Sequence, residues 1–367
     1  MPVRGPARER RYDLWLEFGE QAMIPVNVIF SPDWWSRRFG VSFEEPFYLD
    51  VETRIANDVL MRRALYELFG IGEPDPQPRP IIGSRHIAGG FIIPATLGVP
   101  IRFTAGQAAW PTPLNLDRDA ARQLRAPDVA KTWPMSALIE QMDALQSRFG
   151  YVTGDLNTGG LVNNAVELRG NDLFADLKED PELADHLLAI VEETVVGVSR
   201  ILRQRTGTTS IAVNRSIVSV NPAIHLTSNC SVSMISPRLY ESRVLPHELR
   251  MAELLAPYGI HHCGSNLQKY ADAYNRMDLK FLDVGFGSDI EACSRLFPAA
   301  FLNLRMSPVR MLQGSEDQAY SDALQALTAC GRREKVGVCC INMDGDTPDA
   351  NVRAMFRAAA DFSAKMA

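Results

Sequence analysis

The sequence predicts an α/β protein built as a (β/α)8 TIM barrel with an irregular, partly helical N-terminal extension. In the second half of the chain, short apolar segments alternate strictly with helical ones, and such βα units give parallel strands. So many units favour a closed barrel over an open sheet. The length of 367 residues exceeds the usual single domain but suits one barrel. We therefore expect one domain over residues 1–367, with residues 1–20 as an N-terminal tail.

The first half of the chain is irregular. An early strand is expected over residues 23–30, and residues 51–69 have helical periodicity that ends at Gly70. Residues 71–118 are rich in proline and glycine. Apolar segments such as 91–93 interrupt this stretch, which predicts excursions and short strands of the same domain instead of a linker.

The second half is regular, and Asp180 with Pro181 marks the start of its longest helix. The expected strands cover residues 151–155, 223–226, 259–263, 279–283, 300–305 and 336–340. The expected helices cover residues 181–205, 246–256, 267–276, 289–296, 315–330 and 348–364. Polar residues follow several of these strands, and barrel active sites are assembled at that face.

Composition and charge exclude several functional classes. The net charge is −6, and the one basic cluster, residues 4–11, is short and interrupted by Glu9, which argues against a nucleic-acid binder. No apolar run is long enough to span a bilayer, and the N-terminus lacks the apolar core of a signal peptide. The six cysteines have no framework spacing, which indicates free thiols in a reducing cytoplasm.

The residues 259–264 hold the strongest chemical signal. His261 and Cys263 are two residues apart in a short apolar run, so on a strand they project from the same face. Cys340 ends another apolar run. One imidazole and two thiolates with an open fourth position hold catalytic zinc. The competing interpretation is that the cysteines are small buried apolar residues and the histidine a hydrogen-bonded core residue.

The adjacent cysteines 339 and 340 require a choice, because neighbouring residues on a strand face opposite ways. Cys340 lies nearer the expected carboxyl end of its strand, so we expect it to be the ligand. Cys339 then faces the surrounding helices, and it replaces Cys340 if the expected register is wrong by one residue.

Other polar residues are candidates for contacts to the substrate or to the metal ligands. Asp155, Asn229 and Asp283 lie at or just beyond expected strand ends. The alternative for each is simple hydrogen bonding that caps strand ends and helix starts. Cys230 is a candidate for an additional metal ligand, whereas His225 is more typical of a core histidine. No residue is assigned to cofactor binding.

Four segments give the chain a family resemblance. They are Thr153-Gly154-Asp155, residues 233–246 with their Ser236-Pro237 pair, the His261-His262-Cys263-Gly264 motif, and Cys340 with Thr347-Pro348-Asp349-Ala350-Asn351. From about residue 15 onward, the chain resembles the uroporphyrinogen decarboxylase superfamily, and most closely its zinc-dependent methyltransferases that exchange a methyl group with a corrinoid protein. The Arg-rich Ala-Gly-Arg motif of the decarboxylases is missing, which argues against tetrapyrrole decarboxylation.

The resemblance implies Zn2+ bound by His261, Cys263 and Cys340, with the corrinoid (cobalamin) carried by a separate partner protein. It implies transfer of a methyl group between that corrinoid and a small thiol or methoxy substrate. The direction of transfer stays open, as does the oligomeric state, with a homodimer as one option. Two other functions also stay open: a cobalamin-independent zinc-dependent lyase or hydrolase, and a degenerate barrel that only binds or assembles corrinoid proteins.

Overall fold

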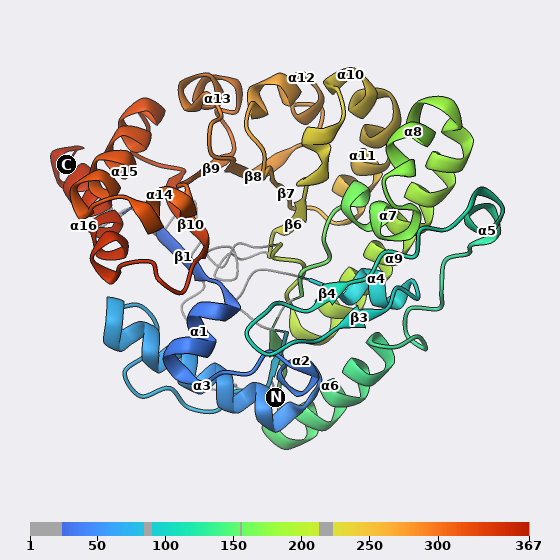
Figure 1. Cartoon of the computed structure of the whole chain (residues 1–367), viewed down its shortest axis with the longest axis horizontal. Helices are drawn as coiled ribbons and strands as arrows, with labels where there is room; N and C mark the ends of the chain where they lie inside the picture. The colour runs from blue at the N-terminus through green and yellow to red at the C-terminus, as the bar shows by residue number, and fades with distance from the viewer. Residues whose placement is uncertain (1–23, 84–89, 155, 213–222, 367) are drawn as a thin grey trace, which may run out of the picture.

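A ring of helices surrounds a curled parallel sheet in the computed structural model (Figure 1), which describes residues 24–83, 90–154, 156–212 and 223–366. The sheet has the order β1 (Val26–Phe30), β10 (Val336–Met343), β9 (Phe301–Arg305), β8 (Leu279–Val284), β7 (Tyr258–His261) and β6 (His225–Ser228). All of its neighbours pair in parallel. Sequential strands that lie side by side in parallel are the product of βα units, so the α/β barrel architecture is confirmed.

Short strands extend this sheet on the side of β6. Strand β2 (Ile81–Ile82) pairs in parallel with β5 (Thr153–Gly154). Parallel bridges then join Leu156 to Ser210 and Ile211 to Leu226 of β6. A separate antiparallel pair, β3 (Ile101–Arg102) and β4 (Trp110–Pro111), belongs to the proline-rich excursion.

The helices follow the strands in chain order. They are α1 (Pro32–Phe39), α2 (Glu45–Leu49), α3 (Val51–Phe69), α4 (Ile92–Thr96), α5 (Arg118–Gln123), α6 (Met135–Phe149), α7 (Leu161–Arg169), α8 (Asp172–Glu179), α9 (Pro181–Thr206), α10 (Pro237–Leu239), α11 (Leu245–Leu254), α12 (Ala271–Tyr274), α13 (Ile290–Leu296), α14 (Pro308–Gln313), α15 (Glu316–Cys330) and α16 (Asp349–Met366). Within the described ranges, no helix has the length and apolarity that crossing a membrane requires.

Most element predictions are confirmed, and the exceptions matter for the site. Helix α3 has the expected bounds, and Asp180 caps α9 by accepting from the backbone N–H of Leu183. Residues 92–93 lie in α4 instead of a strand. Strand β7 ends at His261, so Cys263 lies in the loop beyond it, whereas β10 continues past Cys340 to Met343. The tail 1–20 lies outside the described residues.

The inner face of the sheet changes from apolar to polar along the length of the strands. At the amino ends of the strands, Leu226, Phe281 and Phe301 pack in one apolar cluster on the inner face. Two residues further along their strands, the same face carries Asp283 and Asn303, which are paired in register. The interior is therefore apolar at one end and polar at the carboxyl ends of the strands.

The N-terminal aromatic pair is part of the core. Trp34 and Trp35 of α1 are both 0% exposed, and Trp34 stacks on Phe30 with ring centroids 3.9 Å apart. Of the two roles that these tryptophans could have, covering an aromatic substrate or packing α1 on the barrel, the burial supports packing. His225 is also a core residue, because its Nδ1 lies 3.0 Å from Thr209 Oγ1 and its ring stacks on Tyr258.

Asn351, in the first turn of α16, ties that helix to the end of α14. Its Nδ2 donates to the carbonyl oxygens of Met311 and Gly314 at 2.9 and 2.8 Å, and the residue is 2% exposed. We expect Asn351→Ala to lower the free energy of unfolding by about 2 kcal/mol, because buried carbonyls lose a donor. Chemical denaturation measures this change. The exposed Asn275 is the control, and an equal loss for Asn275→Ala would contradict the assignment.

Candidate metal centre

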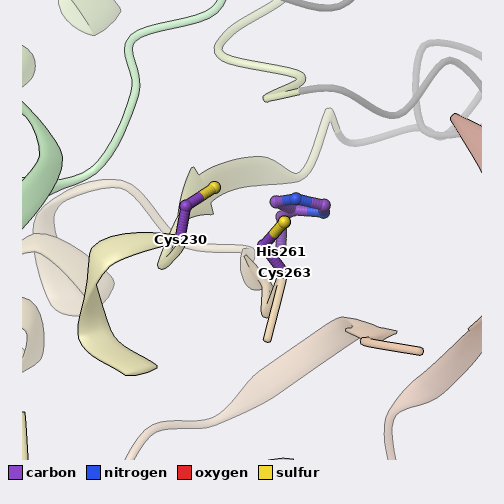
Figure 2. Close-up of side chains that lie close together, drawn as sticks. All are labelled: Cys230, His261 and Cys263. Atoms are coloured by element: carbon purple, nitrogen blue, oxygen red, sulfur yellow. The ribbon is translucent and has the colours of Figure 1, made fainter. Parts of the chain in front are cut away.

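Three potential metal ligands meet beyond the carboxyl ends of two adjacent strands. His261 is the last residue of β7, Cys263 follows in the next loop, and Cys230 lies two residues after the end of β6. One ligand atom of each lies within 4.8 Å of the others (Figure 2). His261 is buried, Cys230 is half-buried and Cys263 is exposed. The cluster therefore has a sealed inner side and one side open to solvent.

The Asp283 carboxylate orients the imidazole. Its Oδ2 lies 2.6 Å from His261 Nδ1, and its Oδ1 accepts a hydrogen bond of 2.7 Å from Asn303 Nδ2. Burial alone lowers the pKa of His261, but the hydrogen bonds to Asp283 and Cys263 outweigh it and raise the pKa. Since Nδ1 carries the proton toward Asp283, Nε2 is the nitrogen left to bind a metal.

A hydrogen bond between the two cysteine side chains shifts their pKa values in opposite directions. Hydrogen bonding from Cys230, followed by that from His261, lowers the pKa of Cys263. The same hydrogen bond raises the pKa of Cys230, with burial as the second cause. Arg305, at the end of β9, brings a positive charge next to this cluster. Its Nη1 lies 3.2 Å from Cys263 Sγ and 3.5 Å from His261 Nε2.

The donor set fits a zinc ion. Two thiolates and one imidazole are ligands that zinc prefers, and three protein ligands leave a position for substrate. The hydrogen bond from His261 to a carboxylate is the usual support for such a ligand. For Nε2 to bind a metal, the Arg305 Nη1 group must give up its contact with that nitrogen.

A close backbone approach brings the Cys263 loop against β8. A Cβ atom on Gly285 would lie 2.1 Å from the carbonyl oxygen of Gly264 and 2.6 Å from that of His262. Any side chain at residue 285 therefore displaces the loop that carries Cys263. The glycine allows the loop to fold over the strand end and position its thiol near His261.

The structure places Cys340, which was predicted as a ligand, outside the three-ligand cluster. Because β10 continues to Met343, Cys340 lies inside the strand and packs, fully buried, in the apolar core shared with the helices. Cys339 instead faces the barrel interior with Ile29 and Ile341. Burial raises the pKa of Cys339, with Asp283 as the second cause, but this thiol is not part of the three-ligand cluster. Cys230 provides the second sulfur there.

The three residues predicted to contact substrate or ligands have different positions. Asp283 contacts His261 directly, as described above. Asn229 is buried next to Cys230, and its Nδ2 donates to Glu248 Oε2 at 3.2 Å and to Tyr274 Oη at 3.3 Å. Asp155 lies outside the described residues. Roles in catalysis for Asp155, Asn229 and Asp283 stay predictions.

A buried polar network lies behind the cluster and was missed by sequence reasoning. Glu248 of α11 accepts from Tyr240 Oη and Asn229 Nδ2, and Tyr274 Oη lies 2.9 Å from His262 Nδ1. Burial raises the pKa of Glu248 to about 7. In sequence these residues look like ordinary positions of amphipathic helices, so no local signal could have identified them. The network connects the residues beside Cys230 and Cys263 to a shared buried carboxyl group.

Comparisons with known proteins support the fold. No protein-family model matches the sequence, and no curated protein matches it either. A methyltransferase from Methanosarcina mazei has a similar structure, with a TM-score of 0.65, 16% sequence identity, and coverage of 93% of this chain and 94% of that chain. At this identity the likeness shows a shared fold, the one that the sequence resemblance implies.

A B12-independent methionine synthase from Shewanella sp. W3-18-1, solved in complex with selenomethionine, also matches. Its TM-score is 0.47 with 12% identity, and the match covers 94% of this chain and 98% of that chain. This score is too low to add to the argument from the fold.

The corrected ligand set makes a specific prediction about cysteine variants. We expect Cys230→Ala to weaken zinc binding at least tenfold, because it removes one of three ligands, whereas Cys340→Ala keeps the zinc affinity and costs stability through a buried cavity. Competition with a chromogenic zinc chelator measures the affinity, and thermal unfolding measures the stability. Loss of zinc from Cys340→Ala together with retention of zinc in Cys230→Ala would show that Cys340, and not Cys230, is the ligand.

The raised pKa of Glu248 predicts a pH-dependent stability. The folded state keeps the Glu248 proton up to about pH 7, whereas the ordinary pKa is 4.5, so the free energy of unfolding falls as the pH rises between these values. The cost is at most about 3 kcal/mol. Glu248→Gln removes this titration. We therefore expect denaturation between pH 4.5 and 8 to show a smaller loss of stability for the variant than for the wild type. Parallel curves would contradict it.

Proposed function

We propose that this protein is a zinc-dependent methyltransferase that moves a methyl group between a small thiol or methoxy substrate and a corrinoid carried by a partner protein. The observation that carries the proposal is the cluster of Cys230, His261 and Cys263 at the carboxyl ends of barrel strands. The shared fold with a methyltransferase is compatible with it. A barrel places substrate at the same face, so donor atoms and substrate meet there.

The side chains of this site have distinct roles in the proposal. Zinc supplies Lewis acidity, which lowers the pKa of a substrate thiol or polarises a methyl ether oxygen. Cys230, His261 and Cys263 hold the ion. Asp283 keeps the His261 proton on Nδ1 and so keeps Nε2 directed at the cluster.

Accessibility supports transfer to a group carried by another molecule. Cys263 is exposed, whereas His261 and Asp283 are buried. A metal held here is reached from the Cys263 side, where a bulky corrinoid on a partner can approach. The buried side of the site is closed by the network of Asn229, Tyr274 and Glu248, which keeps the ligand loops in place.

A direct assay tests the proposal. We expect the chain purified without added metal to hold one zinc per molecule and to demethylate methylcobalamin in the presence of a suitable thiol, with the absorbance change of the corrinoid as the readout. Chelation should abolish transfer, and added zinc should restore it. Bound zinc with no methyl transfer across a panel of thiols and methoxy compounds, but with hydrolysis or elimination, would favour the lyase or hydrolase.

Removal of one ligand distinguishes a catalytic zinc from a structural one. We expect Cys263→Ala to lose zinc and methyl transfer but to keep its fold, because an exposed thiol in a loop contributes little to the barrel core. Zinc content and circular dichroism are measured on the same sample. Unfolding of the variant together with loss of the metal would identify a structural site.

A further inference from the structure

Arg305 is a half-buried cation at the edge of the cluster of Cys230, His261 and Cys263. It ends β9 on the inner face, and its Nη1 contacts Cys263 Sγ and His261 Nε2 at 3.2 and 3.5 Å. Across the described ranges of the chain, no ion pair to Arg305 is present. The hydrogen bonds of this side chain to the described residues therefore go to two of the three proposed metal ligands, and none goes to a carboxylate.

The opposite edge of the guanidinium has no acceptor. Its Nε is buried without a hydrogen-bond partner. The hydrogen bonds that Arg305 makes to the described residues both involve Nη1, so they leave Nη2 unused. A buried donor left unpaired costs free energy comparable to a lost hydrogen bond. The Nε and Nη2 groups form the planar fork that binds both oxygens of a carboxylate.

The Asp283 carboxylate makes its hydrogen bonds to other residues. Asp283 accepts from Asn303 and contacts His261 Nδ1. A metal at Nε2 of His261 further removes one of the two contacts of Nη1. In a zinc-loaded site, Arg305 would lie beside the metal ligands with its Nε still unpaired, and its charge would be available to a substrate.

We propose that Arg305 binds a carboxylate group of the substrate and holds the substrate's thiol or methoxy group toward the Cys230–His261–Cys263 cluster. This inference rests on the proposed function for the identity of the reacting group. It adds a substrate class, small acids that carry a thiol or a methoxy group. Arg305 selects for charge by pairing with the anion, and a neutral analogue leaves its fork unsatisfied.

Binding measurements test this subsite without any turnover. Calorimetric titration of the zinc-loaded full-length chain compares 3-mercaptopropionate with its neutral amide, which has the same thiol and nearly the same shape. We expect the acid to bind about 10- to 100-fold more tightly, the range that a charge-assisted hydrogen bond gives. Arg305→Gln should abolish the preference and leave the affinity for the amide unchanged, and Arg305→Lys should retain part of it.

A matched control and a second anion make the test specific. Arg238 of α10 is exposed and follows β6, so Arg238→Gln should keep the full preference for the acid. Equal affinity of the wild type for acid and amide overturns the proposal. Inorganic phosphate that binds through Arg305 as tightly as the acid overturns the assignment to a carboxylate.

Repeating the titration with chelated protein separates the two proposals. Zinc content is measured for each variant, so loss of the metal is not mistaken for loss of the anion subsite. The protein can prefer propionate over propionamide through Arg305 and yet show no methyl transfer. That result supports the subsite and contradicts the proposed function. Methyl transfer with no preference for the acid contradicts the subsite alone.

Discussion

The Asp283 carboxylate is the interaction on which the site depends. One oxygen contacts His261 on β7 and the other accepts from Asn303 on β9, so a side chain of β8 connects three adjacent strands. In-register pairing of these residues places the three polar groups in one layer of the barrel interior. Such a layer is stable only when its groups satisfy one another, because the surrounding interior is apolar. The orientation of His261 is therefore a property of the sheet.

The loops beyond the strands are constrained from a second direction. Asn229 and His262, the neighbours of Cys230 and Cys263, both contact Tyr274, and Asn229 also contacts Glu248. Helix α11 and the segment of α12 thus hold the two cysteine loops from outside the strand ends. Because the backbone of these loops is anchored by buried side chains, the two thiols can remain near His261 before any metal binds. This preorganisation lowers the cost of assembling a three-ligand site.

Charge at the site is balanced by more than its ligands. Two thiolates and a divalent ion are together neutral, and the positive guanidinium of Arg305 lies beside them, close enough to Cys263 to donate a hydrogen bond to its Sγ. A positive group beside an open coordination position favours an anionic substrate and repels a cationic one. The metal ligands thus provide the reactivity of the site, and Arg305 provides its selectivity for the charge of the substrate.

The sequence by itself determined the alternation of strands and helices, because local apolar periodicity and caps such as Asp180 depend on neighbours in the chain. It also indicated that His261 and Cys263 lie together. It could not decide which distant cysteine joins them, because the end of β10 depends on the pairing of this strand with β1. That pairing continues to Met343, so Cys340 lies inside the strand and faces the helices. Only the tertiary structure brought Cys230, Glu248 and Arg305 to the same place, because their proximity arises from the curvature of the sheet and from helix packing between segments far apart in sequence.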